Sequence, residues 1–159
     1  MPTPENVQRT ASSNELLLEI LCQGDYLAQI RGAVADRARK AGFDEEEIAK
    51  IELAVGEACS NIVKHAYAAG KEWCRRNRDP QIRLDVRNEN DHLVIELNDH
   101  GARFDFASYH PTDIDRNLRE MDAGGYGIAI IRQFMDDVQY SSNDQTGNTL
   151  RMVKYLKKP

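Results

Sequence analysis

The segment Glu52–Tyr67 reads ELAVGEACSNIVKHAY, and the rest of the chain can be interpreted around it. Apolar residues recur every three or four positions through it, which is the period of a helix with one buried face. A neighbouring face carries Glu57, Asn61 and His65 at intervals of four residues, so their side chains stack above one another. Such a carboxylate and carboxamide can accept a proton and coordinate a hard cation such as Mg²⁺. Because many solvated helices carry the same pair, this segment alone does not define a site.

The composition is that of an ordinary folded protein. The 159 residues fit about one domain, with 41% apolar and 30% charged residues. The formal net charge of −5 provides no basic field for nucleic acid. No apolar run approaches the roughly 20 residues of a membrane helix, and no secretory signal opens the chain, so we expect a cytoplasmic protein without a membrane partner. The three cysteines are widely spaced, which favours reduced thiols over a disulfide or zinc site.

The remaining pattern predicts a two-layer α/β (α+β) sandwich. We expect residues 1–13 to be a flexible tail and residues 14–159 to form a single domain. The predicted strands are 15–22, 81–87, 92–98, 138–142 and 149–156, and the predicted helices are 26–40, 45–69 and one opened by Gly124–Gly127. Tight turns join the late strands, so the sheet should be mixed but largely antiparallel, with helices covering one face. The aperiodic stretch 107–123 suggests a mobile loop or lid.

Two further motifs follow the Glu57 and Asn61 pair along the chain. Asp99-x-Gly101 ends a predicted strand, where a carboxylate can accept a hydrogen bond from an exocyclic amine and a glycine lets a flat base approach. The glycine-rich 124–127 stretch precedes a helix, where exposed backbone N–H groups favour phosphates. Together the three pieces predict a nucleotide-binding site. It would have an acceptor for an exocyclic amine, backbone N–H groups that bind phosphates, and a metal ligand beside a general base.

The order E-x-x-x-N, D-x-G, G-G-x-G resembles the Bergerat-type ATP-binding fold of the GHKL superfamily, which includes DNA gyrase, heat-shock chaperones, histidine kinases and MutL. The longer segments GEACSNIVKHAY, LNDHGARFD and GGYGIAIIRQFMDDVQYSSNDQTGNTLRMVKYL resemble bacterial anti-sigma factors of the RsbW and SpoIIAB type, which are also serine/threonine kinases. This resemblance implies ATP and Mg²⁺ as cofactors and a serine on an anti-anti-sigma protein of the STAS type as the substrate. It also implies a sigma factor as an alternative partner, and a homodimer.

The resemblance also implies a role for each matching residue. Glu57 would be the general base that activates the attacking hydroxyl, and Asn61 would hold the Mg²⁺ that bridges the ATP phosphates. Asp99 would bind the adenine amine, with Gly101 beside the base. His65 follows on the same helix, and we expect it to pack rather than to take part in the chemistry.

The resemblance also assigns roles to residues near the ATP phosphates and on the last predicted strand. Gly125 and Gly127 would frame the phosphates and hinge a lid over residues 106–124, and Thr149 would support the adenine end through a water molecule. The chain departs from the wider superfamily at Arg103, where a second glycine two places after Gly101 is common. Arg103 could alter the adenine pocket or contact a phosphate.

Three functions are compatible with this sequence. The first is a protein serine kinase, and the second is a nucleotide-sensitive switch module that sequesters a partner with little phosphotransfer. The third is an ATPase that only hydrolyses ATP. The presence of both Glu57 and Asn61 favours the kinase, because a module that only binds could dispense with the base.

Overall fold

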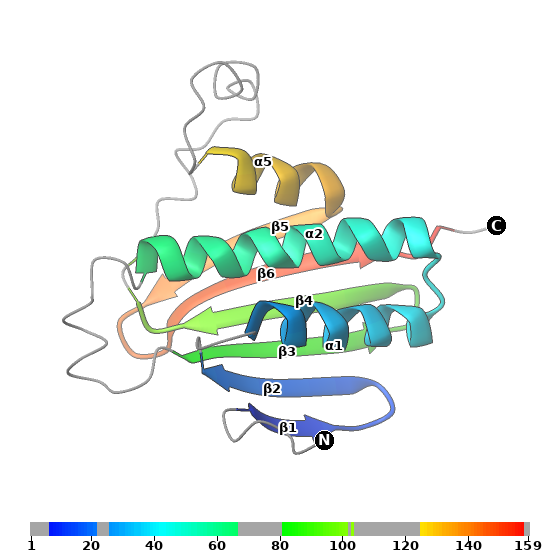
Figure 1. The fold of residues 1–159 in the computed structure, drawn as a ribbon, viewed down its shortest axis with the longest axis horizontal. Coiled ribbons are helices and arrows are strands. Elements are labelled where there is room, and N and C mark those ends of the chain that lie inside the picture. The colour runs from blue at the N-terminus through cyan, green and yellow to red at the C-terminus, as the bar shows by residue number, and fades with distance from the viewer. Residues whose placement is uncertain (1–6, 22–25, 67–80, 102, 104–124, 158–159) are drawn as a thin grey trace.

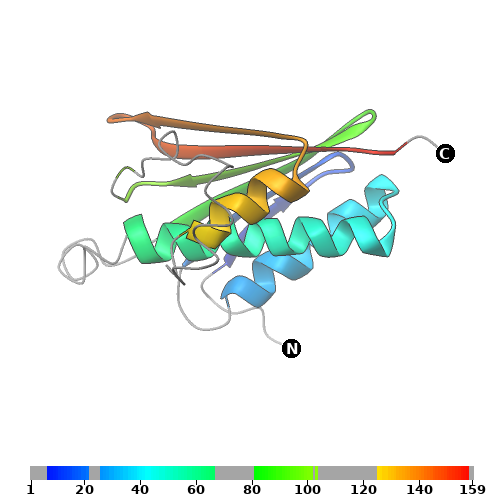
Figure 2. The ribbon, with the colours of Figure 1, turned by 90° about the horizontal axis from the view of Figure 1, so that it is seen from above.

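The computed structural model describes residues 7–21, 26–66, 81–101, 103 and 125–157. In this part of the chain, three α-helices lie against one face of a six-stranded sheet (Figure 1). Seen from above, the helices form one layer and the sheet forms the other (Figure 2). The structure therefore confirms the two-layer sandwich that the sequence predicts. The predicted lid at 106–124 lies outside the described residues.

The strands pair in the order β1-β2-β3-β4-β6-β5, and every pairing is antiparallel. Their bounds are β1 (Val7–Ala11), β2 (Glu15–Leu21), β3 (Gln81–Glu89), β4 (His92–Asp99), β5 (Asp137–Asn143) and β6 (Gly147–Tyr155). The prediction of a largely antiparallel sheet is confirmed, and no parallel pairing occurs among these strands.

Strand β1 corrects the prediction of a loose tail over residues 1–13. Val7–Ala11 form an edge strand that pairs with β2, and five residues are too few for alternation alone to reveal a strand. The buried guanidinium of Arg37, on helix α1 (Tyr26–Ala41), donates to the carbonyl oxygens of Ser12 at 3.1 Å and Ser13 at 2.9 Å, in the turn after β1. This tertiary contact fastens the hairpin to the helix layer, and a local sequence pattern does not contain it.

The helices are α1 (Tyr26–Ala41), α2 (Glu45–Asn61) and α5 (Gly125–Phe134). Helix α2 lies between the other two and begins at Asp44, whose carboxylate accepts the backbone N–H of Glu47 at 2.8 Å. A π-helical turn, Ile62–Ala66, follows α2 directly, and the side chain of His65 lies outside the described residues. None of the described helices has the length and apolar character needed to cross a membrane.

One hydrophobic cluster joins the helix layer to the sheet. On β4, the alternate residues Leu93, Ile95 and Leu97 are fully buried against the helices. The apolar face of α2 that the helical period predicts enters the same cluster, for example through Ile51. Because side chains alternate along a strand, Asp99 falls on the same side of β4 as Leu97 and faces the helix layer.

A charged cluster surrounds the buried carboxylate of Glu47 at the start of α2. The carboxylate of Glu47, only 5% exposed, lies 3.1 Å from Nζ of Lys154, 3.0 Å from Nζ of Lys157 and 3.2 Å from Nζ of Lys50. Lys154 also donates to the carbonyl oxygen of Phe134 at 2.7 Å, at the end of α5. Burial raises the pKa of Glu47, but hydrogen bonds from the three lysines outweigh it and lower the pKa to about 2.

We expect Glu47→Gln to destabilise the protein by about 3 kcal/mol at neutral pH, because the buried Lys154 ammonium then keeps only the more distant carboxylate of Asp136, at 3.8 Å, as a counter-charge. The folded pKa of about 2 is below the ordinary value of 4.5, so this stabilisation is present above pH 4.5 and is lost as the pH falls through 2. Urea unfolding at pH 7 and pH 3 should show a smaller difference between wild type and variant at pH 3. Glu46→Gln, whose side chain is 80% exposed, is the matched control. Equal differences at both pH values would contradict the assignment.

Candidate functional site

Glu57 and Asn61 lie on neighbouring turns of α2, and the first turn of α5 packs against both. A β-carbon placed on Gly127 would lie 2.8 Å from Nδ2 of Asn61, 3.1 Å from its Oδ1 and 3.1 Å from Oε2 of Glu57. A side chain at this position would force the ends of the Asn61 and Glu57 side chains to shift. Glu57 and Asn61 are both partly exposed, so a ligand can reach them. The structure thus brings together three residues that the sequence predicts for one site.

The start of α5 supplies the third element of this arrangement. Gly125 is the first residue of the helix, so its first turn, which includes Gly127, lies beside Asn61. The N–H groups of a first helical turn have no partner within the helix and favour anions. The π-helical turn Ile62–Ala66 begins directly after Asn61, and such turns are frequent at functional sites. The helix start can therefore receive phosphates next to a carboxylate and an amide.

A cation from α1 lies against the same part of α2. The guanidinium of Arg31 lies within 2.9 Å of the point that a β-carbon of Gly56 would occupy, and Gly56 directly precedes Glu57. Arg31 is not among the residues that the sequence predicts for the site, because nothing in the pattern of one helix shows which residues of another helix it contacts.

Asp99 forms the second part of the site, at the end of β4. Its side chain is 4% exposed, and Oδ1 accepts the backbone N–H of Gly101 and Nδ2 of Asn148, both at 2.9 Å. Asn148 is opposite Asp99 in the register of β6 and also donates to the carbonyl oxygen of Gly101 at 3.0 Å. Burial raises the pKa of Asp99, and the hydrogen bonds from Asn148 and Gly101 counteract part of that rise. Asn148 is not among the residues that the sequence predicts for the site, since only the strand register shows that it faces Asp99.

Thr149 is not brought to Asp99. Neighbouring residues of a strand point to opposite faces, so Asn148 faces the helix layer and Thr149 faces the uncovered side of the sheet. There Oγ1 of Thr149 accepts Nδ2 of Asn98 at 3.1 Å. The residue of β6 that contacts Asp99 is Asn148, one residue before Thr149.

The turn between β5 and β6 holds Asn148 in this position. Gly147 has φ +81°, and a β-carbon there would overlap the carbonyl oxygen of Asp99 and lie 2.7 Å from Nδ1 of His100. A residue with a side chain would therefore be both strained and displaced. This glycine lets the turn close on the end of β4 and brings Asn148 level with Asp99.

Both parts of the site lie at the same end of the molecule. In Figure 1 the end of β4, the turn from β5 to β6, the end of α2 and the start of α5 all lie on the left side. Asp99 faces the helix layer, which also carries Glu57 and Asn61. Arg103 is exposed and lines a shallow cavity with residues 142–145. Among the described residues, no group of three or more His, Cys, Asp and Glu side chains is arranged to hold a metal ion.

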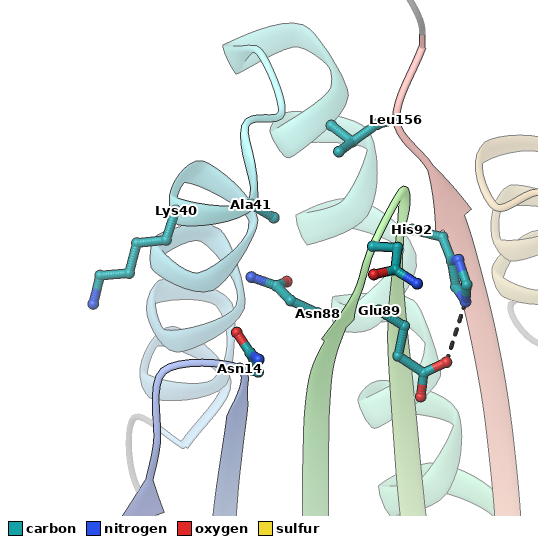
Figure 3. A pocket seen from close by; sticks show the side chains of 8 residues that line it. Asn14, Lys40, Ala41, Asn88, Glu89, His92 and Leu156 are labelled. Atoms are coloured by element: carbon teal, nitrogen blue, oxygen red, sulfur yellow. Dashed lines mark ion pairs between the residues drawn. The ribbon is translucent and has the colours of Figure 1, made fainter.

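A separate cavity of about 540 Å³ lies between the end of α1 and the β3–β4 turn (Figure 3). Its lining is mostly polar and consists of Asn14, Lys40, Ala41, Asn88, Glu89, Asn90, His92 and Leu156. Nε2 of His92 lies 3.3 Å from Oε2 of Glu89. None of the residues that the sequence predicts for the site lines this cavity, which is at the other end of β4 from Asp99.

The sequence is similar to those of a known domain family and of several bacterial proteins. The sequence model of the histidine kinase-like ATPase domain matches residues 23–154. The chain is 31% identical over 145 residues to the serine-protein kinase RsbW of Bacillus cereus strain G9842, an alignment that covers 89% of this chain and 84% of the relative. The serine-protein kinase RsbW of Bacillus mycoides strain KBAB4 is 29% identical over the same coverage.

We expect Gly127→Ala to weaken ATP binding by about tenfold or more, because the added methyl group would displace Asn61 and Glu57 from the start of α5. Isothermal titration with ATP and Mg²⁺ measures the effect, and thermal unfolding checks that the fold persists. Gly32→Ala is the matched control, since a β-carbon on Gly32 of α1 meets no atom within 4 Å. Wild-type affinity in Gly127→Ala would show that the close approach is not needed for the nucleotide.

Proposed function

Because the chain belongs to the histidine kinase-like ATPase domain family and is an RsbW-type member of it, we propose that it is an ATP-dependent kinase that phosphorylates a serine of a partner protein. The observation that carries this proposal is the packing of Gly127 on Glu57 and Asn61. This packing brings the partly exposed carboxylate of Glu57, the amide oxygen of Asn61 and the start of α5 together in one site. Phosphoryl transfer requires these parts, because the protein contributes mainly positioning and neutralisation of charge.

Each part has a defined task in the proposed transfer. The first turn of α5 donates backbone N–H groups to the phosphates, and Gly127 keeps that turn close to α2. Glu57 accepts the proton of the attacking serine hydroxyl. Asn61 offers an amide oxygen to Mg²⁺, which when bound neutralises phosphate charge. Asp99 accepts the exocyclic amine of adenine, and Gly101 leaves space beside the base.

The partner class follows from the RsbW-type resemblance. We propose an anti-anti-sigma protein of the STAS type as the substrate and a sigma factor as a partner held in alternation with it. This partner switching would regulate transcription from the cytoplasm, through a homodimer of this chain.

We expect Glu57→Gln to reduce phosphotransfer by about 10²- to 10⁴-fold while leaving ATP affinity close to wild type, because the amide keeps the shape and loses the base. Asn61→Ala should lower both ATP–Mg²⁺ affinity and transfer. The assay uses γ-labelled ATP and a purified STAS-type acceptor, with ATP affinity measured separately.

Glu52→Gln, on the same helix, is the control and should transfer at the wild-type rate. Transfer at that rate by Glu57→Gln would refute the assignment of the base. Wild-type protein that binds ATP but labels no acceptor would favour the switch module that only sequesters its partner.

An exposed apolar residue marks where the acceptor protein should lie. Leu53 is 40% exposed and precedes Glu57 by one turn of α2, which is about 6 Å along the helix axis. A protein that brings its hydroxyl to Glu57 would cover Leu53. We expect Leu53→Asp to raise the KM for the acceptor by about tenfold or more without changing ATP affinity.

Tyr155→Asp is the matched control, because Tyr155 is the other exposed large hydrophobic side chain among the described residues and lies at the end of β6. It should leave the KM for the acceptor unchanged. Equal effects of the two substitutions would indicate a general loss of stability. An unchanged KM in Leu53→Asp would show that the acceptor protein does not bind over Leu53.

A further inference from the structure

Three polar side chains form one row across the strands at the end of the sheet. Asp99 of β4 is opposite Asn148 of β6, and Asn148 is opposite Ser142 of β5. Oγ of Ser142 lies 2.8 Å from Oδ1 of Asn148, and Nδ2 of Asn148 lies 2.9 Å from Oδ1 of Asp99. The row therefore runs from the edge strand of the sheet to the carboxylate proposed to read the base.

The contacts determine which way the Asn148 amide points. Its NH₂ group faces Oδ1 of Asp99 and the carbonyl oxygen of Gly101, and both of these can only accept hydrogen bonds when Asp99 is ionised. The reversed amide would place an oxygen against two acceptors. The amide oxygen must therefore face Ser142, whose hydroxyl donates to it. Each hydrogen bond in such a chain polarises the next one.

This row also determines which oxygen Asp99 presents to a ligand. Both described hydrogen bonds to the carboxylate, from Asn148 and from the Gly101 backbone, go to Oδ1. Within the part of the chain that the structure describes, no donor is directed at Oδ2. The ring of a ligand that meets Oδ2 must carry a hydrogen-bond donor, since an ionised carboxylate repels a carbonyl oxygen.

We propose that Ser142 and Asn148 are positioning residues that make the Asp99 subsite selective for a purine with an amine at C6 over a purine with a carbonyl there. This inference rests on the proposed ATP-dependent function and adds the residues that set its base selectivity. Asn148 holds Oδ1 of Asp99 so that Oδ2 faces the base, and Ser142 prevents the Asn148 amide from turning.

The test compares three nucleotides on each variant by competition for a fluorescent ATP analogue. The nucleotides are ATP, purine riboside triphosphate, which lacks the C6 amine, and inosine triphosphate, which carries a carbonyl instead. In the wild type, we expect ATP to bind at least about tenfold more tightly than the other two. Asn148→Ala should reduce that ratio by about tenfold and Ser142→Ala by about threefold, which matches the loss of one or two hydrogen bonds.

The affinity for purine riboside triphosphate should stay near the wild-type value in both variants, because this nucleotide makes no use of the oriented carboxylate. A general loss of packing would weaken all three nucleotides together. Asn148→Ala should also raise the pH below which ATP binding is lost. The reason is that the Asn148 hydrogen bond lowers the pKa of Asp99.

The adjacent row on the opposite face supplies a matched control. Ser141 of β5 pairs with Thr149 of β6, which accepts a hydrogen bond from Asn98. Ser141→Ala should leave the ratio of affinities unchanged. An unchanged ratio in Asn148→Ala, or an equal fall in Ser141→Ala, would overturn the inference. Failure of the folded wild type to bind any of the nucleotides would instead overturn the proposed function.

Discussion

The buried carboxylate of Glu47 determines how α5 sits relative to α2 and the sheet. Its ion pair with Lys154 joins the start of α2 to β6, and Lys154 in turn binds the last carbonyl oxygen of α5. At its other end, α5 contacts α2 through Gly127. One helix is therefore held at its two ends, by charge at one and by close packing at the other. The position of its first turn beside Glu57 depends on both contacts.

The polar chemistry gathers at one end of this framework. The carboxylate and amide of α2 meet the start of α5, and Asp99 is held by Asn148 at the end of β4. In each pair a glycine, Gly127 or Gly147, removes the side chain that would prevent the approach. Because the surrounding elements pack through one hydrophobic cluster, these groups are positioned before a ligand arrives. Such preorganisation is the main contribution that a protein makes to phosphoryl transfer.

The local predictions agree with the structure where one element carries the whole signal. The period of α2, the acidic start of that helix and the alternation of β4 each depend on neighbours along the chain. Both elements form where predicted, although the α-helix gives way to a π-helical turn at Ile62. The predictions fail where a partner comes from a distant segment. Strand β1 is too short to identify without β2, and Thr149 faces away from Asp99 because a strand reverses its side with each residue.

The sequence by itself determined the fold class, the family, and the grouping of Glu57, Asn61, Asp99 and Gly127 into one predicted site. These features follow from short-range periodicity and from motifs whose spacing can be read along the chain. Only the tertiary structure decided which residues meet across elements, such as Asn148 with Asp99 and Lys154 with Glu47. The physical reason is that such contacts depend on strand register and helix packing, which bring together positions 49 and 107 residues apart.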